Sequence, residues 1–510
     1  MRSLVASVRS TNPHFWHGLF VVFLLFYLAI LFSQLGHGLA SEDGHGAIKA
    51  ARALVDDHRL EVSRPPGHPV TEFYLFGLIA WILRHGFGSA FGDEAYLALQ
   101  ALAGVAGVVV FYGLVLRLST APWKAFVASI CLAFSAQYFA NTVDGEEFVF
   151  AVLFLLLSLR LLLVSRGTRP GIVRLFSSVL CFALATGCRP EAVLAGILFP
   201  VYCLLHPQLG WKHVIGIIFA QGVAILVIWS PVLVVGLHAP WTAGMNVRES
   251  ILGGGYRLVF QCFTPPVFLV FCWIFVAAIA QWRERIKESF PRDFVFVSSC
   301  LTSVIFCAAL FFHASKAAHV LFVVPFLLLL AISRSKALTA LAAMTILGCF
   351  ASLDIFKDRQ LVSPFAIPGA YFQALRQKPF YKLGYLRQVL QQAGPERSVM
   401  IADLWRWDLE YHRTRGAFPA REQIFTDLTK AEFAVFFPQE NDKCILLPRD
   451  GAFQNHFLEE WQSQGYALKM DAILYRALFA RYDVTAPLVD HVQIGDLVFH
   501  LFFPKGQQRR

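Results

Sequence analysis

Long apolar runs separated by short polar segments fill the first 353 residues of the chain. Several of these runs reach the roughly 20 residues that a helix needs to cross a bilayer, and the others are marginal. Apolar runs of this length predict membrane-spanning helices, whereas the helices of a soluble protein alternate between apolar and polar faces. The twelve runs lie at residues 18–35, 70–86, 95–116, 125–140, 147–164, 172–187, 190–205, 213–236, 264–282, 294–312, 318–333 and 337–353.

The composition agrees with a membrane protein that has many spans. Hydrophobic residues make up 57% of the 510 residues and the mean hydropathy is +0.57, whereas soluble domains contain about 45–50% apolar residues. The run at 18–35 is long enough to span, and no evident cleavage site for a secretory signal follows it. The ten cysteines predict no disulfide framework, because only Cys444 lies in the polar C-terminal region.

The positions of the basic residues predict a topology. If the run at 70–86, which contains Glu72 and Arg84, lies at the membrane surface instead of crossing it, 15 basic residues fall on one side. Because Lys and Arg accumulate in cytoplasmic loops, we expect eleven spans, a cytoplasmic N-terminus and an extracytoplasmic C-terminus. The net charge of +10 then reflects topology, and no nucleic-acid partner is expected. The predicted inside loops are shorter than about 15 residues, which is too short for a nucleotide-binding domain.

Beyond residue 353 the sequence becomes mixed and polar. We expect an all-α polytopic membrane domain at 1–353, a proline-containing linker at 354–381 and a small extracytoplasmic α/β domain at 382–510. A loosely ordered cap is the alternative for the last of these. The expected helices and strands of this region follow from apolar periodicity. The helices lie at 382–393 and 453–463, and the strands at 398–403, 431–437 and 492–503.

Two groups of acidic residues fall on the predicted outer face. Glu42 and Asp43 follow the first span, and Asp144, Glu146 and Glu147 directly precede another. A carboxylate at such a position can deprotonate an acceptor hydroxyl or amine as a general base. Several carboxylates together can instead bind a divalent cation, and acids at the start of a helix are also favoured by its dipole alone. The sequence leaves these alternatives open.

Four basic residues fall on the same predicted face, against the preference of Lys and Arg for the cytoplasmic side. Arg64 lies in a proline-rich turn, Arg189 at a membrane-edge turn, and Lys316 and His319 at the start of a late span. Such donors suit a phosphate or diphosphate at the level of the lipid headgroups. The structural alternatives are an ion pair between Arg189 and Glu191 and side chains that reach toward the interface.

Four segments in this order resemble the GT-C superfamily of integral-membrane glycosyltransferases, and above all its protein O-mannosyltransferase and aminoarabinose lipid A transferase group. They are SEDGHGAIKAARAL…SRPPGHPVTEFYLFGLIAWIL, ANTVDGEEFVFAVLFLLL, LATGCRPEAVLAGILFP and HASKAAHVLFVVPFLLLLA. The resemblance implies a GT-C fold and the transfer of a sugar from a polyprenyl-phosphate carrier to an acceptor on the periplasmic or lumenal face. The acceptor, which is a protein, a lipid or a glycan, is left open.

The same resemblance implies roles for single residues. By position, Asp43 becomes the expected catalytic base and Glu42 the less favoured one. The order here is Glu-Asp where the relatives commonly have Asp-Glu, which leaves open which of the two carboxylates faces the acceptor. The donor phosphate is expected to bind to Arg64, Arg189, Lys316 and His319. The second acidic loop, Asp144, Glu146 and Glu147, is expected to face the acceptor or a metal. A divalent cation is the candidate cofactor, and the expected location is a bacterial inner membrane with the C-terminal domain in the periplasm.

Two other classes of protein fit parts of this pattern. A secondary transporter or flippase for a lipid or small anion would also have many spans, but transporters place their ionisable groups near the middle of the bilayer. A membrane scaffold without catalysis would not need the acids and cations. Because these groups gather on one predicted face, the sequence favours an enzyme that works at the membrane surface.

Overall fold

The chain forms two compact units in a computed structural model: a helical unit, Met1–Leu375, and a sheet unit, Arg376–Arg510. The break between them falls inside the expected linker. The structure describes residues 13–63, 67–119, 121–144, 146–163, 171–235, 255, 258–259, 263–280, 290, 292–312, 317–351, 356–357, 360–361, 371–372, 375, 378–381, 383, 398–402, 411–412, 415–416, 423–425, 443–447, 490–494 and 497–502.

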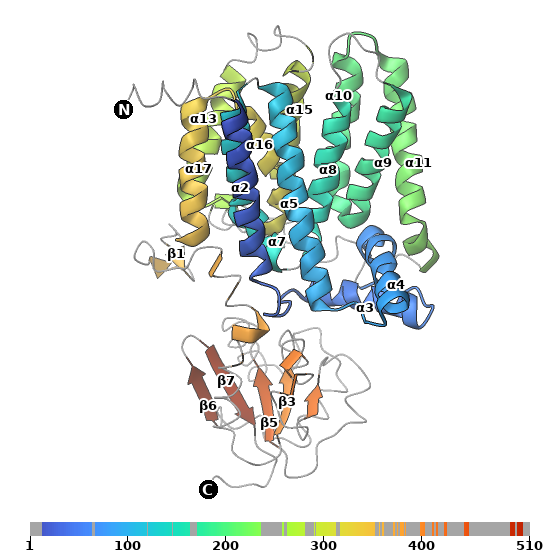
Figure 1. Cartoon of the computed structure of the whole chain (residues 1–510), viewed down its shortest axis with the longest axis vertical. Coiled ribbons are helices and arrows are strands. Elements are labelled where there is room, and N and C mark those ends of the chain that lie inside the picture. Colours follow the sequence, from blue (N-terminus) through green and yellow to red (C-terminus); the bar gives the residue numbers. More distant parts are fainter. Residues whose placement is uncertain are drawn as a thin grey trace. The chain divides into compact units, whose positions relative to one another are not determined.

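The helices of the helical unit stand side by side as a bundle (Figure 1). Among the described residues, helices long and apolar enough to cross a membrane are α2 (Pro13–Phe32), α5 (Asp93–Leu118), α11 (Trp211–Val235) and α15 (Arg292–Phe312). Shorter apolar helices are α8 (Phe148–Leu162), α9 (Ile172–Cys188), α13 (Pro265–Ala280) and α17 (Ser335–Phe350). The chain is therefore an integral membrane protein, while the count of eleven spans and the sides of the termini stay predictions.

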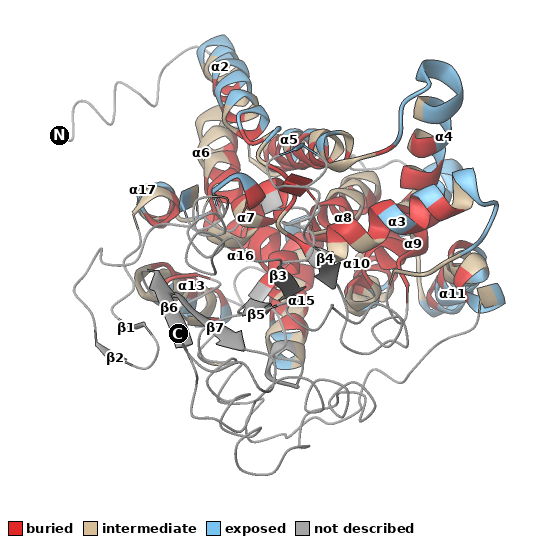
Figure 2. Ribbon diagram, turned by 90° about the horizontal axis from the view of Figure 1, so that it is seen from below, coloured by how far each residue is buried: buried red, intermediate tan, exposed pale blue. Residues whose placement is uncertain are grey.

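The centre of the bundle contains α16 (Val324–Ala331), of which every residue is buried. Figure 2 shows buried positions gathered on α5, α8 and α16, whereas exposed positions follow α2 and α11. The exposed side chains of α11 are largely apolar, Ile215 and Phe219 among them. A long helix that exposes such side chains suits a surrounding of lipid.

Two apolar segments change their helical form along their length. The run expected at 190–205 begins as the 3-10 helix η2 (Pro190–Ile197) and continues as α10 (Leu198–Leu205). The run expected at 318–333 begins as the 3-10 helix η4 (Ala317–Phe322) and continues as α16. In both, the tighter turn stands where the expected outer loop meets the span.

The apolar run at 125–140, expected to form one span, is divided. It forms α6 (Pro122–Ala133) and α7 (Ala136–Asp144), which are bent by 61° at the break. No proline or glycine stands at this break. Instead the hydroxyl of Ser135 donates to the carbonyl of Leu132 at 3.0 Å, and the Ser135 N–H donates to the same carbonyl at 3.2 Å. These local bonds close the last turn of α6 and end the helix.

Three short elements lie at one end of the bundle: α3 (Glu42–Asp56), the π-helical turn η1 (Val70–Leu75) and α4 (Phe76–Phe87) (Figure 1). η1, with 6 residues, continues directly into α4, with 12, and the two together are at most about 27 Å long, slightly less than the roughly 30 Å hydrocarbon core of a bilayer. A Cβ on Gly77 would lie 2.8 Å from Leu54 Cδ2, so α4 packs closely on α3. The juxtamembrane position expected for 70–86 agrees with this length and stays a prediction.

The sheet unit contains a five-stranded sheet in the order β4-β3-β5-β7-β6. Its strands are β3 (Ser398–Ala402), β4 (Gln423–Phe425), β5 (Lys443–Leu447), β6 (Asp490–Ile494) and β7 (Leu497–Phe502). β3 pairs in parallel with β4 and β5, and β7 pairs antiparallel with β5 and β6.

The strand predicted at 398–403 corresponds to β3. The single strand predicted at 492–503 is wrong, because Ile494 pairs with Leu497 across a two-residue Gly-Asp connection, which is typical of hairpins. The expected strand at 431–437 and the expected helices, apart from Leu383, lie outside the described residues.

Candidate functional site: a carboxylate cluster around Arg189

Asp43 is placed by the start of α3. The helix begins because Ser41 is its N-cap, with a side-chain oxygen that accepts from the Gly44 N–H at 3.5 Å. From the first turn, Asp43 Oδ2 lies 3.6 Å from Arg189 Nη2. The helix dipole favours an acid at this position, and the guanidinium adds a second reason for it to be ionised.

Glu146 and Glu147 reach the same guanidinium from the segment between α7 and α8. Their Oε2 atoms lie 3.5 Å and 2.9 Å from Arg189 Nη2. The buried Gln100 of α5 holds this segment, because its amide donates to the main-chain carbonyl of Asn141 at 2.6 Å and to that of Glu146. A buried amide that bonds both sides of a loop fixes the direction of the acids that the loop carries.

Arg189 directly follows α9, at a point of very close packing. A Cβ on Gly187 would lie 2.5 Å from Val70 Cγ2 and 2.6 Å from Ile228 Cγ2, so glycine lets η1 and α11 close on the end of α9. The guanidinium is buried and stacks on the Phe148 ring, 3.8 Å from its centre. Burial by itself lowers the pKa of Arg189, but the neighbouring glutamates outweigh burial and raise this pKa above its usual value. Arg189 is therefore a permanent buried cation.

Asp43, Glu146, Glu147 and Arg189 form what we call the carboxylate cluster. Three carboxylates around one guanidinium leave a net charge of −2 when all are ionised. The Glu147 side chain is 0% exposed, whereas those of Asp43 and Glu146 are 15% and 19% exposed. Asp43 and Glu146 thus have exposed surface, whereas Glu147 is enclosed beside Arg189.

A second ion pair lies beside the cluster. His319 Nδ1, in η4, lies 3.3 Å from Glu191 Oε1, in η2. The His319 ring meets the Phe148 ring edge to face, with 5.3 Å between centroids. Phe148 therefore contacts both Arg189 and His319, and the two basic side chains lie against the same aromatic ring. Among the described ion pairs, the partner of Glu191 is His319, whereas the sequence had suggested Arg189.

The structure brings together Asp43, Glu146, Glu147 and Arg189, and it places His319 next to them. The structure does not describe the side chains of four other expected site residues. Arg64 and Lys316 lie outside the described residues, as do the side chains of Glu42 and Asp144.

Sequence reasoning missed Gln100 and Phe148. Gln100 carried a signal, because it is a polar residue inside the apolar run at 95–116. Phe148 carried none, because it is one of 49 phenylalanines.

The second acidic loop was one expected place for a divalent cation. Within the described part of the chain, no group of three His, Cys, Asp or Glu side chains is arranged to hold a metal ion. The Arg189 guanidinium also stands between the three carboxylates, where it already supplies the positive charge. A divalent cation therefore stays a prediction, and no chemistry is assigned to it.

Family models and curated protein sequences give no match to this chain. Two solved structures of ArnT from Cupriavidus metallidurans are similar to it. The apo form gives a TM-score of 0.54 at 15% identity, over 96% of this chain and 98% of that chain. The form bound to undecaprenyl phosphate gives a TM-score of 0.53 at 14% identity, over 95% and 98%. The chain has a GT-C fold. The GT-C fold implied by the four sequence segments is thus confirmed.

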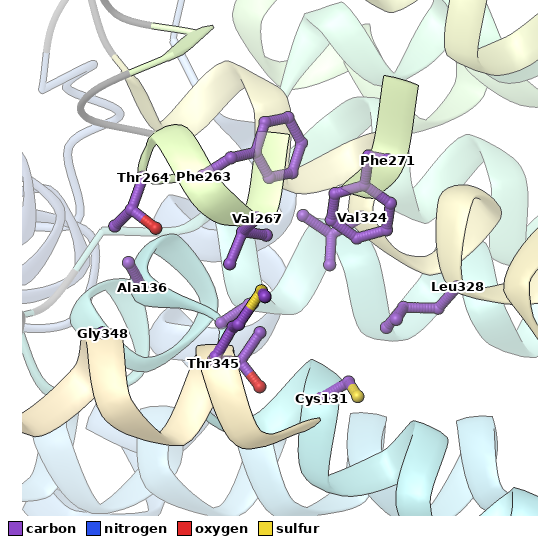
Figure 3. Close-up of a pocket in the computed structure, with 12 residues that line it drawn as sticks. Cys131, Ala136, Phe263, Thr264, Val267, Phe271, Val324, Leu328, Thr345 and Gly348 are labelled. Carbon is purple, nitrogen blue, oxygen red and sulfur yellow. The ribbon is translucent and has the colours of Figure 1, made fainter. Parts of the chain in front are cut away.

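Inside this GT-C fold, a pocket opens between α6, α13, α16 and α17 (Figure 3). Its lining is mostly apolar, with Phe271 and Leu328 as examples and Thr264, Thr345 and Ser135 as polar exceptions. Thr264 is buried and has a φ of +63°, which is rare for a β-branched residue. In the described part of the chain, its hydroxyl has no hydrogen-bond partner. The free space in the pocket is about that of a single water molecule.

Proposed function

We propose that the protein is a membrane glycosyltransferase that moves a sugar from a polyprenyl-phosphate-linked donor to an acceptor on the extracytoplasmic face. The observation that carries this proposal is the carboxylate cluster. Acids from α3 and from the α7–α8 segment meet one buried arginine that follows α9. Two of these acids have surface for a substrate, and His319 lies beside them.

Asp43 is the proposed general base. Its carboxylate takes the proton from the acceptor hydroxyl or amine, and the freed electron pair attacks the anomeric carbon of the donor sugar. The bond between this carbon and the phosphate oxygen breaks, and polyprenyl phosphate leaves with the electron pair. Asp43 is preferred over Glu147 because Glu147 is fully buried, and Glu146 is left as the second carboxylate in reach of the acceptor.

The cations divide into two roles in this proposal. Arg189 holds the three carboxylates in place, and their charge disfavours a phosphate at the same guanidinium. The departing phosphate is instead assigned to His319, together with Arg64 and Lys316 as the sequence predicts. Cationic donors stabilise the charge that develops on such a leaving group.

A lipid-linked donor suits the fold. The ArnT structure with the same fold is bound to undecaprenyl phosphate. We place the cluster on the periplasmic side of a bacterial inner membrane, with the N-terminus in the cytoplasm. The acceptor is a protein, a lipid or a glycan, and the sheet unit is the proposed place for choosing it.

The test is a transfer assay with the purified full-length protein in liposomes. Radiolabelled polyprenyl-phosphate sugars are supplied one by one, with a membrane extract as the source of acceptors. We expect one of the sugars to move from the lipid phase to the acceptor fraction. The rival, a lipid transporter, predicts no transfer of any sugar together with movement of a fluorescent polyprenyl lipid across the bilayer, and this result would overturn the proposal.

A further inference from the structure

A second group of buried charges lies outside the reaction proposed above. Glu72, in η1, has a side chain that is 0% exposed, and that of His68 is 3% exposed. Burying a carboxylate is unfavourable unless charge partners and hydrogen bonds compensate for the lost water. A charged residue retained at such a position therefore points to a specific task for it.

Three groups converge on one oxygen of Glu72. Its Oε1 accepts from the Ser63 N–H at 3.3 Å and from the Ser63 hydroxyl, and it lies 3.6 Å from His68 Nδ1. The Glu72 N–H in turn donates to the His68 carbonyl at 2.8 Å. Glu72 thus fastens Ser63 and His68 to the first turn of η1.

The described residues next to Glu72 are closely packed. Gly67 has a φ of +94°, and a Cβ there would lie 2.9 Å from Val62 Cγ1 and 3.1 Å from Val232 Cγ2. The first turn of η1 packs on the end of α9 through Val70 and Gly187. Val70, two residues before Glu72, is therefore packed against a residue that lies two before Arg189.

The close packing continues to the donor side of the cluster. Val70 of η1 packs on Gly187, two residues before Arg189 and four before Glu191. Glu191, in η2, pairs with His319 at 3.3 Å. Contacts therefore lead from Glu72 through η1 to the start of η2 and on to η4.

We propose that Glu72 and His68 are positioning residues that hold His319 in place for the donor phosphate, which rests on the function proposed above. Glu72, fully buried, acts through its neighbours. It fixes His68 and the first turn of η1, Val70 in that turn packs on Gly187 at the end of α9, and Glu191 orients the imidazole of His319. Removing the charge of Glu72 loosens Ser63 and His68 first and His319 in consequence.

The first readout is hydrogen exchange of the wild-type protein, Glu72→Gln and the control Glu61→Gln in nanodiscs. The control removes an acid of the same segment whose ion pair is made with Lys49 at 2.8 Å. We expect the Ser63 amide to exchange at least about fivefold faster in Glu72→Gln and within about twofold of wild type in Glu61→Gln. An unchanged Ser63 amide in Glu72→Gln overturns the proposal. If Glu72→Gln does not fold, Ser63→Ala is used in its place. The affinity expected for Ser63→Ala is the same as for Glu72→Gln, and hydrogen exchange is then measured for the peptide around His68.

The second readout is the affinity for a fluorescent short-chain polyprenyl phosphate. We expect Glu72→Gln and His319→Ala each to weaken binding about tenfold, and the double variant to weaken it about tenfold as well, because both changes remove one coupled effect. If Glu72 has only a structural role, the effects of the two changes on binding are independent, and the double variant should lose about 100-fold in affinity. This result would refute the positioning role. If the Ser63 amide of Glu72→Gln exchanges faster but the variant binds polyprenyl phosphate with wild-type affinity, the positioning role is refuted and the proposed function is not. A wild-type protein that binds no polyprenyl phosphate overturns the proposed function as well.

Discussion

Arg189 shows how one residue can organise a site. Its guanidinium meets Asp43, Glu146 and Glu147 within 3.6 Å, and its stack on Phe148 fixes the plane in which it meets them. Two of the carboxylates are partly exposed and the third is fully buried, so one arginine joins acids that solvent can reach to an acid that it cannot.

Replacing Arg189 by Gln should destabilise the protein strongly. The fully buried Glu147 would lose the partner at 2.9 Å, and breaking a buried ion pair from one side costs about 3–5 kcal/mol. Chemical unfolding in detergent, followed by tryptophan fluorescence, measures the change.

Arg84→Gln is the matched control for Arg189→Gln. The pair that Arg84 makes with Asp56 at 3.3 Å is exposed, so we expect a loss of only about 0–1 kcal/mol. Equal stability losses in the two variants would contradict the central place given to Arg189.

Much of the cluster could be predicted at the scale of residues. Charge in the loops placed Asp43, Glu146, Glu147 and Arg189 on one face, and the structure brings these four together. Their pairing could not be predicted, because it depends on distances between segments that lie 42 to 146 residues apart in the chain. For the same reason the sequence predicts that Arg189 binds the donor phosphate and does not reveal the three carboxylates that surround it.

At the scale of elements, the apolar runs located the helices well but not their interruptions. Two of the runs begin as 3-10 helices, and another divides into α6 and α7. The division depends on Ser135, whose hydroxyl bonds within the preceding turn. Serine is common inside membrane helices, so its type alone does not reveal such a break. The close contact of η1 with the end of α9 was equally invisible, because it depends on the missing Cβ of Gly187.

The close contact at Gly187 predicts that adding a single methyl group there lowers the stability of the protein. In Gly187→Ala the new Cβ would lie 2.5–2.6 Å from two side-chain carbons, and such overpacking costs about 1–3 kcal/mol. We therefore expect lower stability by the same unfolding measurement, together with faster hydrogen exchange in η1.

Gly216→Ala on α11 serves as its control. Nothing lies within 4 Å of a Cβ at that position, and alanine is about 0.5–1 kcal/mol better than glycine inside a helix. This variant should be as stable as the wild type or more so. A Gly187→Ala protein with wild-type stability would show that η1 does not press on the end of α9.

At the scale of the whole molecule, the fold and the membrane character are established, but the sides of the membrane are still predicted. The prediction depends on one decision, namely that the run at 70–86 does not cross. The close packing of α4 on α3 favours that decision. If it is correct, acids and cations of the cluster share the extracytoplasmic face.

Cysteine labelling can decide the topology. Asp57 and Ser89 are exposed and flank the run at 70–86, and Lys336 is exposed on the expected inner side. In a background without native cysteines, Asp57→Cys and Ser89→Cys should both react with an impermeant maleimide in spheroplasts, whereas Lys336→Cys should react only after permeabilisation. Opposite behaviour of positions 57 and 89 would show that the run crosses the membrane and would reverse every later loop.

The central claim is that Asp43 takes the proton of the acceptor in a sugar transfer from a polyprenyl-phosphate donor. The most direct measurement compares wild-type and Asp43→Asn protein for transfer of radiolabelled sugar and for binding of polyprenyl phosphate in the same preparations. We predict that the variant binds the lipid phosphate within about twofold of wild type and transfers at least about 100-fold more slowly, as expected for loss of a general base. Transfer by Asp43→Asn at the wild-type rate would contradict the account.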